Sequence, residues 1–234
     1  KVITQSVFEE AIERVIAGPE RKSRLINKDE KRIIAYHEAG HAVVMNAIPE
    51  SDPVQKVTII PRGMAGGYTL SLPTEDRILM PKKKMIAEMI GLMGGRAAEA
   101  VVFDDITSGA SNDIERVTKL ARTMVTRLGM SEKMGPMVYG QKEELIFLGR
   151  EISEQRDYSE SVAEQIDQEV QQLVADSYQK ALEILKQYRV QLDAIAERLL
   201  EVETLSRDEF EKIFPPPEPK RTGIPMLNGA NGSH

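Results

Sequence analysis

Helical periodicity is the feature that most restricts the folds open to this chain. Over most of its 234 residues, apolar side chains recur three or four positions apart, as they do along one face of an α-helix. The longest block starts at a capping signal around Ser159 and carries its apolar stripe to Leu199, which predicts either one long helix or two helices packed together. Because such a stripe has to be buried against other helices, we expect a mainly α fold.

Five further helices are expected before and after this block. Each is indicated by a capping signal, by an apolar stripe of helical period, or by a glycine or proline that ends it. They are predicted over residues 6–17, 28–48, 85–103 and 113–128, and over a short segment that starts after Ser206 and ends at Phe214.

One segment has a different residue pattern, which predicts β structure. Between residues 53 and 73, valines and isoleucines that favour strands come first, turn-forming residues follow, and residues 68–72 alternate with a period of two. We expect a small β hairpin or sheet here, attached to the helical body. A further strand is predicted at residues 145–148, in a segment that is otherwise irregular.

Composition excludes several classes of protein. Cysteine is absent, so disulfide frameworks, thiol nucleophiles, iron–sulfur clusters and cysteine-ligated zinc sites are ruled out. The net charge is −6 and the basic residues are dispersed, which argues against nucleic acid as a partner. No apolar run approaches the roughly 20 residues that span a bilayer, so we expect a soluble chain that makes no membrane contact of its own.

Two histidines on the predicted helix 28–48 form the clearest candidate site. His37 and His41 lie four residues apart, roughly 40° around the helix axis, so both imidazoles can reach one zinc ion. Glu38 lies within reach of a water on the metal, where its carboxylate can act as general base. Two histidines buried only for packing are the alternative, but the chain has three histidines in all and a chance match to this pattern is rare. We therefore predict one zinc ion per chain.

The third zinc ligand has to be a carboxylate. A hydrolytic zinc site uses three protein ligands and leaves a fourth position for water. Cysteine is absent, and the remaining histidine, His234, lies in a Gly/Asn/Ser-rich end segment. Glu99 and Asp113 are the candidates. Each also has an alternative role without a metal: Asp113 can be a carboxylate favoured at a helix N-terminus, and Glu99 can be a solvated or salt-bridged helix residue. The residues alone favour Asp113 only slightly.

Six short motifs occur in the chain between Phe8 and Phe214. They are FEEA (8–11), HEAGH (37–41), GGRAAE (94–99), TSGASND (107–113), MSEKMGP (130–136) and FLG (147–149). Together, and in this order, they resemble the peptidase half of the FtsH family, whose members are membrane-anchored, ATP-dependent zinc proteases. The implied fold is a helical zinc-metalloprotease domain with a small β hairpin or sheet.

This resemblance also implies a role for each candidate residue. His37, His41 and Asp113 are expected to hold the zinc ion. Glu38 is expected to be the general base, and Glu99 a nearby carboxylate that orients or supports the site. The implied reaction is zinc-assisted hydrolysis of a peptide bond by an activated water, without a covalent intermediate.

The resemblance further implies that the chain is part of a longer polypeptide. Residues 1–24 are expected to be the end of an AAA+ ATPase module and a linker, residues 25–214 the zinc metalloprotease domain, and residues 215–234 a disordered tail. The chain has no phosphate-binding-loop motif, so ATP and Mg²⁺ are expected only in the part outside it. For the intact protein, the family implies a homohexamer at the cytoplasmic face of the inner membrane that degrades unfolded or membrane polypeptides.

Two other functions remain open at this point. The chain can be a non-catalytic, zinc-stabilised oligomerisation module, although a structural zinc site would normally have four protein ligands and no fourth is evident. It can also be a zinc hydrolase of small amides or esters, which the residues do not exclude. Residues 68–72 are expected either to pair with an extended substrate as an edge strand or to form an ordinary hairpin over the core.

Overall fold

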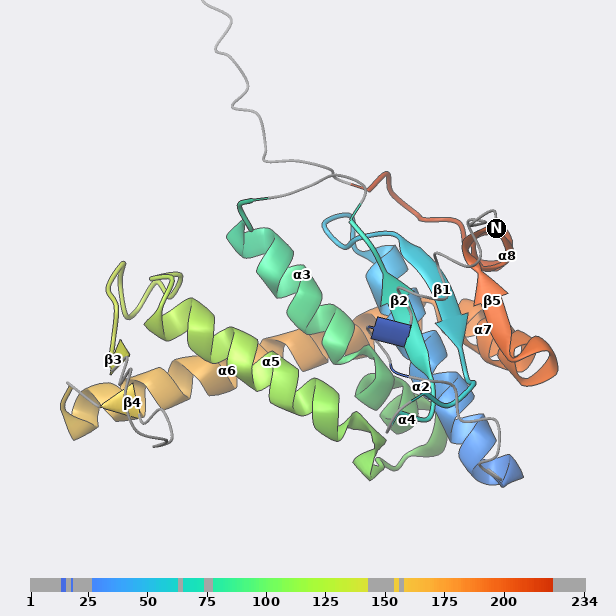
Figure 1. The fold of residues 1–234 in the computed structure, drawn as a ribbon, viewed down its shortest axis with the longest axis horizontal. Helices are drawn as coiled ribbons and strands as arrows, with labels where there is room; N and C mark the ends of the chain where they lie inside the picture. The colour runs from blue at the N-terminus through green and yellow to red at the C-terminus, as the bar shows by residue number, and fades with distance from the viewer. Residues whose placement is uncertain are drawn as a thin grey trace, which may run out of the picture.

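The computed structural model describes residues 14–15, 18, 27–62, 65–73, 78–142, 154–155 and 158–220. The helix predicted over residues 6–17 lies outside this part of the chain except for two helical positions, and the strand predicted at residues 145–148 lies outside it entirely. The described residues form a mainly helical fold with a small antiparallel sheet, as expected (Figure 1). No helix among them is both long enough and apolar enough to cross a membrane.

Helix α2 (Lys28–Ala47) lies at the centre of the fold and carries both histidines. It begins as predicted at Asn27, whose side-chain oxygen accepts a hydrogen bond from the backbone N–H of Glu30 at 2.7 Å. Its second half is buried. Two later helices, α4 (Gly94–Phe103) and α7 (Arg189–Val202), pack against it. The site residues on α2 therefore lie in the interior, as the sequence predicted.

The helix predicted over residues 85–103 is in fact two helices. Helix α3 (Lys82–Leu92) starts three residues early, and α4 begins after the single linking residue Met93. Gly94 and Gly95 have no side chains, so the start of α4 can turn and lie directly on α2. Local periodicity carries no sign of this break, because the turn is stabilised by a contact with a distant helix.

Helix α5 (Ser111–Thr126) follows a single 3₁₀ turn (Ser108–Ala110) and places Asp113 in its first turn. The sequence predicted that this helix would reach Leu128, but it ends two residues earlier. Gly129 follows with a φ of 58°, a left-handed conformation that glycine adopts without strain. The helix end is therefore shifted, while glycine has the role that was predicted for it.

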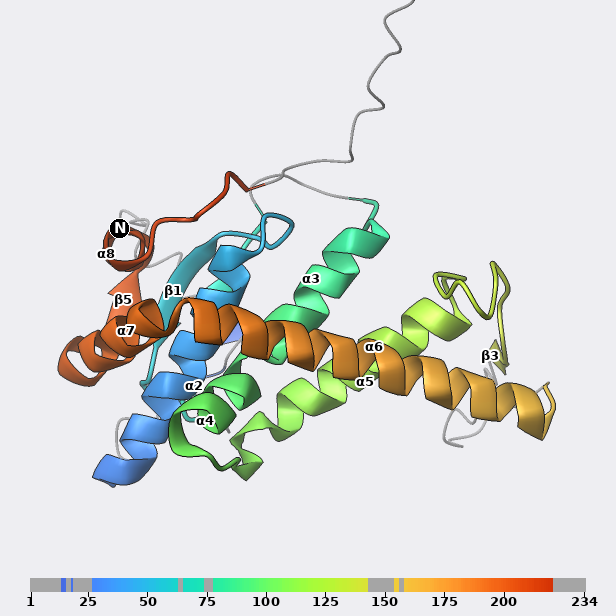
Figure 2. The same ribbon diagram turned by 180° about the vertical axis from the view of Figure 1, so that it is seen from behind.

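The long helical block is two helices that follow one another end to end (Figure 2). Helix α6 (Glu160–Gln187) begins at its N-cap Ser159, as predicted, and α7 follows after Tyr188. Tyr188 has φ −107° and ψ 34°, outside the helical region, and its ring packs on Phe214 at a centroid distance of 4.8 Å. This packing fixes the break that the sequence had left undecided.

The sheet has three strands in the order β2-β1-β5. Strand β1 (Val54–Thr58) pairs with β2 (Tyr68–Ser71) and, on its other side, with β5 (Thr204–Ser206), both antiparallel. The predicted hairpin is confirmed, whereas β5 was not predicted. Helix α8 (Arg207–Ile213) begins with the expected capping box. Two short strands, β3 (Gln141–Lys142) and β4 (Glu154–Gln155), form a separate pair.

The segment after α8 runs back to the end of α2. Residues 215–220 have neither helix nor strand, and residues 221–234 of the predicted tail lie outside the described residues. The ammonium group of Lys220 donates to the backbone carbonyls of Met45, Asn46 and Ile48 at 2.6, 2.8 and 2.9 Å. These carbonyls lie at the C-terminal end of α2 and have no partner inside the helix, so Lys220 caps it.

Candidate metal centre

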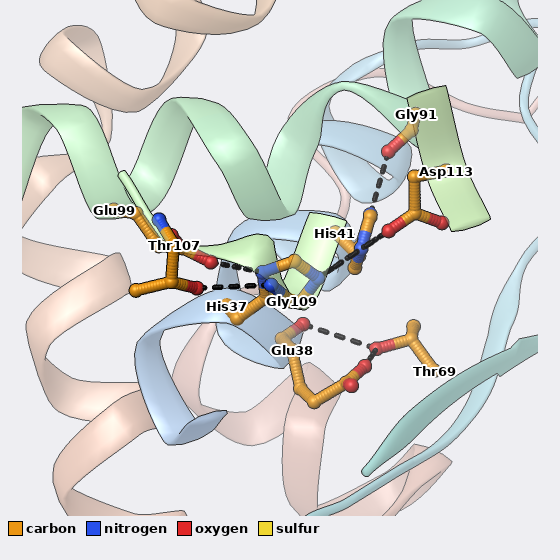
Figure 3. A network of polar contacts seen from close by, with 9 residues as sticks. All are labelled: His37, Glu38, His41, Thr69, Gly91, Glu99, Thr107, Gly109 and Asp113. Carbon is orange, nitrogen blue, oxygen red and sulfur yellow. Dashed lines mark hydrogen bonds and ion pairs between the residues drawn. The ribbon is translucent and has the colours of Figure 1, made fainter. Parts of the chain in front are cut away.

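His37, His41 and Asp113 meet at one point beside α2 (Figure 3). The two imidazole Nε2 atoms lie 3.1 Å apart, and each lies 3.4 Å from Oδ2 of Asp113. Both histidines are buried and the aspartate is half-buried. Within the described part of the chain, this is the one group of His, Asp and Glu side chains whose ligand atoms converge closely enough to hold a metal ion.

The three ligand atoms have the spacing that a tetrahedral zinc ion requires. Zinc binds imidazole nitrogen and carboxylate oxygen at about 2.0–2.1 Å, so two ligands of a tetrahedral ion stand about 3.3 Å apart. The observed edges of 3.1 and 3.4 Å match that value. Two imidazoles and one carboxylate are also a ligand set typical of hydrolytic zinc sites. The residues present therefore fit a zinc ion.

Each imidazole is oriented by a hydrogen bond at its other ring nitrogen. Nδ1 of His37 lies 2.7 Å from Oε1 of Glu99, and Nδ1 of His41 lies 2.8 Å from the backbone carbonyl of Gly91. Both partners accept hydrogen bonds, so each Nδ1 donates, and in the neutral form of each imidazole Nε2 presents its lone pair to the site. Glu99 is itself held, because its Oε2 accepts from the backbone N–H of Thr107 at 2.6 Å. The glutamate thus lies behind His37, outside the group of converging ligand atoms.

The charges around the two imidazoles favour a bound cation. Burial lowers the pKa of His37, but Asp113, Glu99 and Glu38 outweigh it and raise that pKa to about 10. Burial acts to raise the pKa of Asp113, and the two histidines outweigh it and hold that pKa well below its usual range. The pKa of Glu99 is also lowered, since its hydrogen bonds to His37 and Thr107 outweigh its burial. The site therefore attracts positive charge, as a proton or as a metal ion.

Glu38 lies next to this group without joining it. Its carboxylate Oε2 lies 2.9 Å from the hydroxyl of Thr69 on strand β2 (Figure 3). Burial raises the pKa of Glu38, although the nearby histidines and Thr69 work in the opposite direction. A carboxylate with a raised pKa beside a metal site is suited to accept a proton and to return it.

The site opens into a cleft of about 990 Å³ between α2, the start of α5 and the edge strand β2. Gly66 and Gly67 line it next to Tyr68, Thr69 and Leu70. A Cβ atom on Gly67 would lie 2.9 Å from Cγ of Glu38 and 2.6 Å from the carbonyl oxygen of Thr58, so only glycine lets the chain pass this close to the glutamate. The edge strand thus forms one wall of the cleft directly beside Glu38.

The sequence did not single out two residues that shape the site. A Cβ atom on Gly95 would collide with the imidazole of His37, so this glycine makes room for the ring. Its signals in the sequence were a pair of glycines inside a predicted helix and its place in the GGRAAE motif (94–99), neither of which indicates a contact with His37. Thr69 lies in an alternating strand in which nothing distinguishes a threonine that contacts Glu38 from one that faces solvent. Both contacts depend on the tertiary fold.

The chain also matches known proteins over nearly its whole length. Residues 24–213 match Peptidase family M41. The ATP-dependent zinc metalloprotease FtsH of Thermotoga maritima is 57% identical over 213 residues, which cover 91% of this chain and 35% of the relative. The ATP-dependent zinc metalloprotease FtsH 1 of Sphaerobacter thermophilus is 52% identical over 236 residues, 100% of this chain and 36% of the relative. This chain thus spans about a third of the length of these relatives. The resemblance seen in the sequence is confirmed, and the chain belongs to peptidase family M41.

Proposed function

We propose that this chain is the zinc-dependent endopeptidase part of an ATP-dependent protease that degrades unfolded or membrane polypeptides. The observation that carries the proposal is the convergence of His37, His41 and Asp113 at zinc-ligand spacing, with Glu38 beside them, in a member of peptidase family M41. His37, His41 and Asp113 are the proposed ligands of one zinc ion per chain, and Glu38 is the proposed general base.

The chain's own residues supply the proton transfers and the orientation. A zinc ion held by the three ligands supplies Lewis acidity, which polarises a carbonyl group and acidifies water. Glu38 accepts the proton of the attacking water and delivers it to the leaving amine. The carboxylate of Glu99 and the carbonyl of Gly91 keep the imidazoles turned toward the metal through their Nδ1 hydrogen bonds.

The position of the edge strand β2 argues for a polymeric substrate. It pairs with β1 on one side only, among the described residues, and its residues 68–70 line the cleft next to the site. An extended polypeptide can pair with such an edge through main-chain hydrogen bonds, which depend little on side-chain identity. This favours unfolded polypeptides over small amides. It also supports a substrate-pairing role for β2 over that of an ordinary hairpin, the two alternatives that the sequence left open.

The domain organisation and assembly are proposed from the family. Residues 1–24 would be the end of an AAA+ module and a linker, residues 25–214 the protease domain, and residues 215–234 a tail. The relatives are named ATP-dependent zinc metalloproteases and are about three times as long as this chain, which supports an ATPase part outside it that binds ATP and Mg²⁺. The intact protein would be a homohexamer at the cytoplasmic face of the inner membrane.

The test compares a disordered polypeptide, a tightly folded domain of similar length and a small amide, each incubated with the zinc-loaded chain with and without ATP. We expect internal cleavage of the disordered polypeptide without ATP. The folded domain should survive, because a domain stable by about 5–15 kcal/mol exposes extended chain too rarely. Hydrolysis of the small amide alone would overturn the proposal in favour of a small-molecule hydrolase, and no hydrolysis at all would favour a structural zinc module.

A further inference from the structure

The hydroxyl of Thr69 joins the edge strand to Glu38 (Figure 3). Its Oγ1 lies 2.9 Å from Oε2 of Glu38 and 3.0 Å from the backbone carbonyl oxygen of the same residue. A hydroxyl has one proton to donate, and a carboxylate accepts it more strongly than a neutral carbonyl does. Within the described part of the chain, this hydroxyl is the one hydrogen-bond donor to the Glu38 carboxylate.

The strand fixes the position of that hydroxyl. Thr69 pairs with Val57 of the central strand β1, so its backbone is held by the sheet. Gly67, two residues earlier, passes so close to Glu38 that even a Cβ atom would meet its Cγ at 2.9 Å. Glutamate has three rotatable side-chain bonds and would otherwise sample several rotamers. Strand β2 therefore restricts this side chain in two ways, by close contact at Gly67 and by a hydrogen bond at Thr69.

We propose that Thr69 is a positioning residue that holds the Glu38 carboxylate in the orientation needed for proton transfer. This inference rests on the proposed role of Glu38 as general base. Thr69 engages Oε2, while Oε1 has no hydrogen-bond partner among the described residues and remains available for the proton of the attacking water. A base contributes only when it lies within hydrogen-bond reach of the proton it removes, so loss of its orientation lowers the rate of the chemical step.

The kinetic test compares three variants of the zinc-loaded chain on a flexible peptide substrate. Thr69→Val keeps the branched shape and removes the hydroxyl, whereas Thr69→Ser keeps the hydroxyl. Thr204→Val is the matched control, because it removes a threonine hydroxyl from the far strand β5, where it bonds to Thr58 at 2.7 Å. We expect kcat to fall about tenfold in Thr69→Val with KM changed less than about twofold, and Thr69→Ser and Thr204→Val to stay near wild type. A rise in KM at constant kcat, or no rescue by serine, would overturn the proposal.

Glu38→Gln separates this proposal from the one on which it rests. If Thr69 acts through Glu38, adding Thr69→Val to Glu38→Gln lowers the residual rate no further. Additive losses would overturn the role of Thr69 and leave that of Glu38 intact. Near-normal turnover of Glu38→Gln itself would instead overturn the proposed function.

A spectroscopic measurement gives a readout that does not depend on turnover. With ¹³C at the side-chain carboxyl carbon of glutamate, the Glu38 resonance can be assigned by its absence in Glu38→Gln. We expect this resonance to shift in Thr69→Val and to stay near its wild-type position in Thr69→Ser and Thr204→Val. An unchanged resonance in Thr69→Val would show that the hydroxyl does not hold the carboxylate.

Discussion

Gly40 of α2 and Gly94 of α4 touch backbone to backbone where these two helices cross. A Cβ atom on Gly40 would lie 2.5 Å from the carbonyl oxygen of Gly94, and one on Gly94 would lie 2.8 Å from the carbonyl oxygen of Gly40. Neither position can therefore carry a side chain unless the helices separate. Helix α2 carries His37 and α4 carries Glu99, so this crossing sets the distance between the imidazole and the carboxylate that orients it.

We expect Gly40→Ala to destabilise the protein. An alanine in a helix interior normally stabilises by up to about 1 kcal/mol relative to glycine, but overpacking a close contact costs about 1–3 kcal/mol. The net free energy of unfolding should fall, as measured by urea denaturation. Gly91→Ala is the matched control, because its Cβ would meet only the flexible side chain of Met45, at 3.0 Å. Equal stability of the two variants would contradict this account of the crossing.

Gly95→Ala should weaken zinc binding with little loss of helix α4. The added methyl group would collide with the His37 ring and turn its Nε2 away from the other two ligand atoms. We expect the zinc dissociation constant to rise by about 10- to 100-fold, the range typical of changes to residues that orient a ligand. A competition titration with a chelator measures it. Zinc binding as tight as in the unaltered chain would show that a methyl group at position 95 does not displace the His37 ring.

Asp113→Asn and Glu99→Gln distinguish a zinc ligand from a residue that orients one. Oδ2 of Asp113 lies 3.4 Å from both Nε2 atoms, whereas Glu99 contacts His37 only at Nδ1. A neutral amide is a poor zinc ligand, so Asp113→Asn should lose zinc almost completely. Glu99→Gln should retain it with an affinity reduced by about 10- to 100-fold. Zinc content after dialysis against a chelator checks both, and equal or reversed losses would put Glu99 among the ligands.

Glu38→Gln should keep zinc and lose activity. Glutamine has nearly the same size and can still contact the hydroxyl of Thr69, but it cannot accept the proton of water. We expect one zinc ion per chain by metal analysis, together with peptide hydrolysis lowered at least about 100-fold. Loss of the metal in this variant would mean that Glu38 is a ligand and not the base.

Zinc affinity should increase with pH. In the metal-free chain, the neighbouring carboxylates raise the pKa of His37 to about 10, so this residue is protonated at neutral pH. Zinc binds only the neutral imidazole and must displace that proton. The apparent affinity should therefore rise by about tenfold per pH unit between about pH 6 and pH 8, with release of a proton that calorimetry in buffers of different ionisation enthalpy detects. An affinity independent of pH in this range would contradict the prediction.

Local signals were sufficient to locate α2 and its two histidines. The Asn27 cap and the spacing of four between His37 and His41 lie within one helix, where sequence distance translates directly into spatial distance. The choice between Glu99 and Asp113 was different. Both are more than 60 residues from His37, and only the packing of α4 against α2 and of α5 against α3 and α6 determines which carboxylate faces the two Nε2 atoms.

The missed elements have the same physical cause. Strand β5 is three residues long, too short to show a period, and it is extended because Leu205 pairs with Val57. The break between α3 and α4 follows from the contact of Gly94 with Gly40. Each is decided by a partner far away in the sequence, so a pattern within either segment cannot reveal it.

The cap that Lys220 places on α2 has a consequence for the order in which the protein matures. Lys220 follows Ile48, whose carbonyl it binds, by 172 residues. At about 5–20 residues per second, the ribosome completes the histidine helix roughly ten seconds or more before it makes the residue that closes the end of that helix. Strand β5, which completes the sheet beside the cleft, is also made late. We expect a ribosome-bound chain stalled before Thr204 to bind zinc more weakly than the released chain. Chain order would then keep the proteolytic site unfinished while the nascent polypeptide is itself still unfolded and open to cleavage.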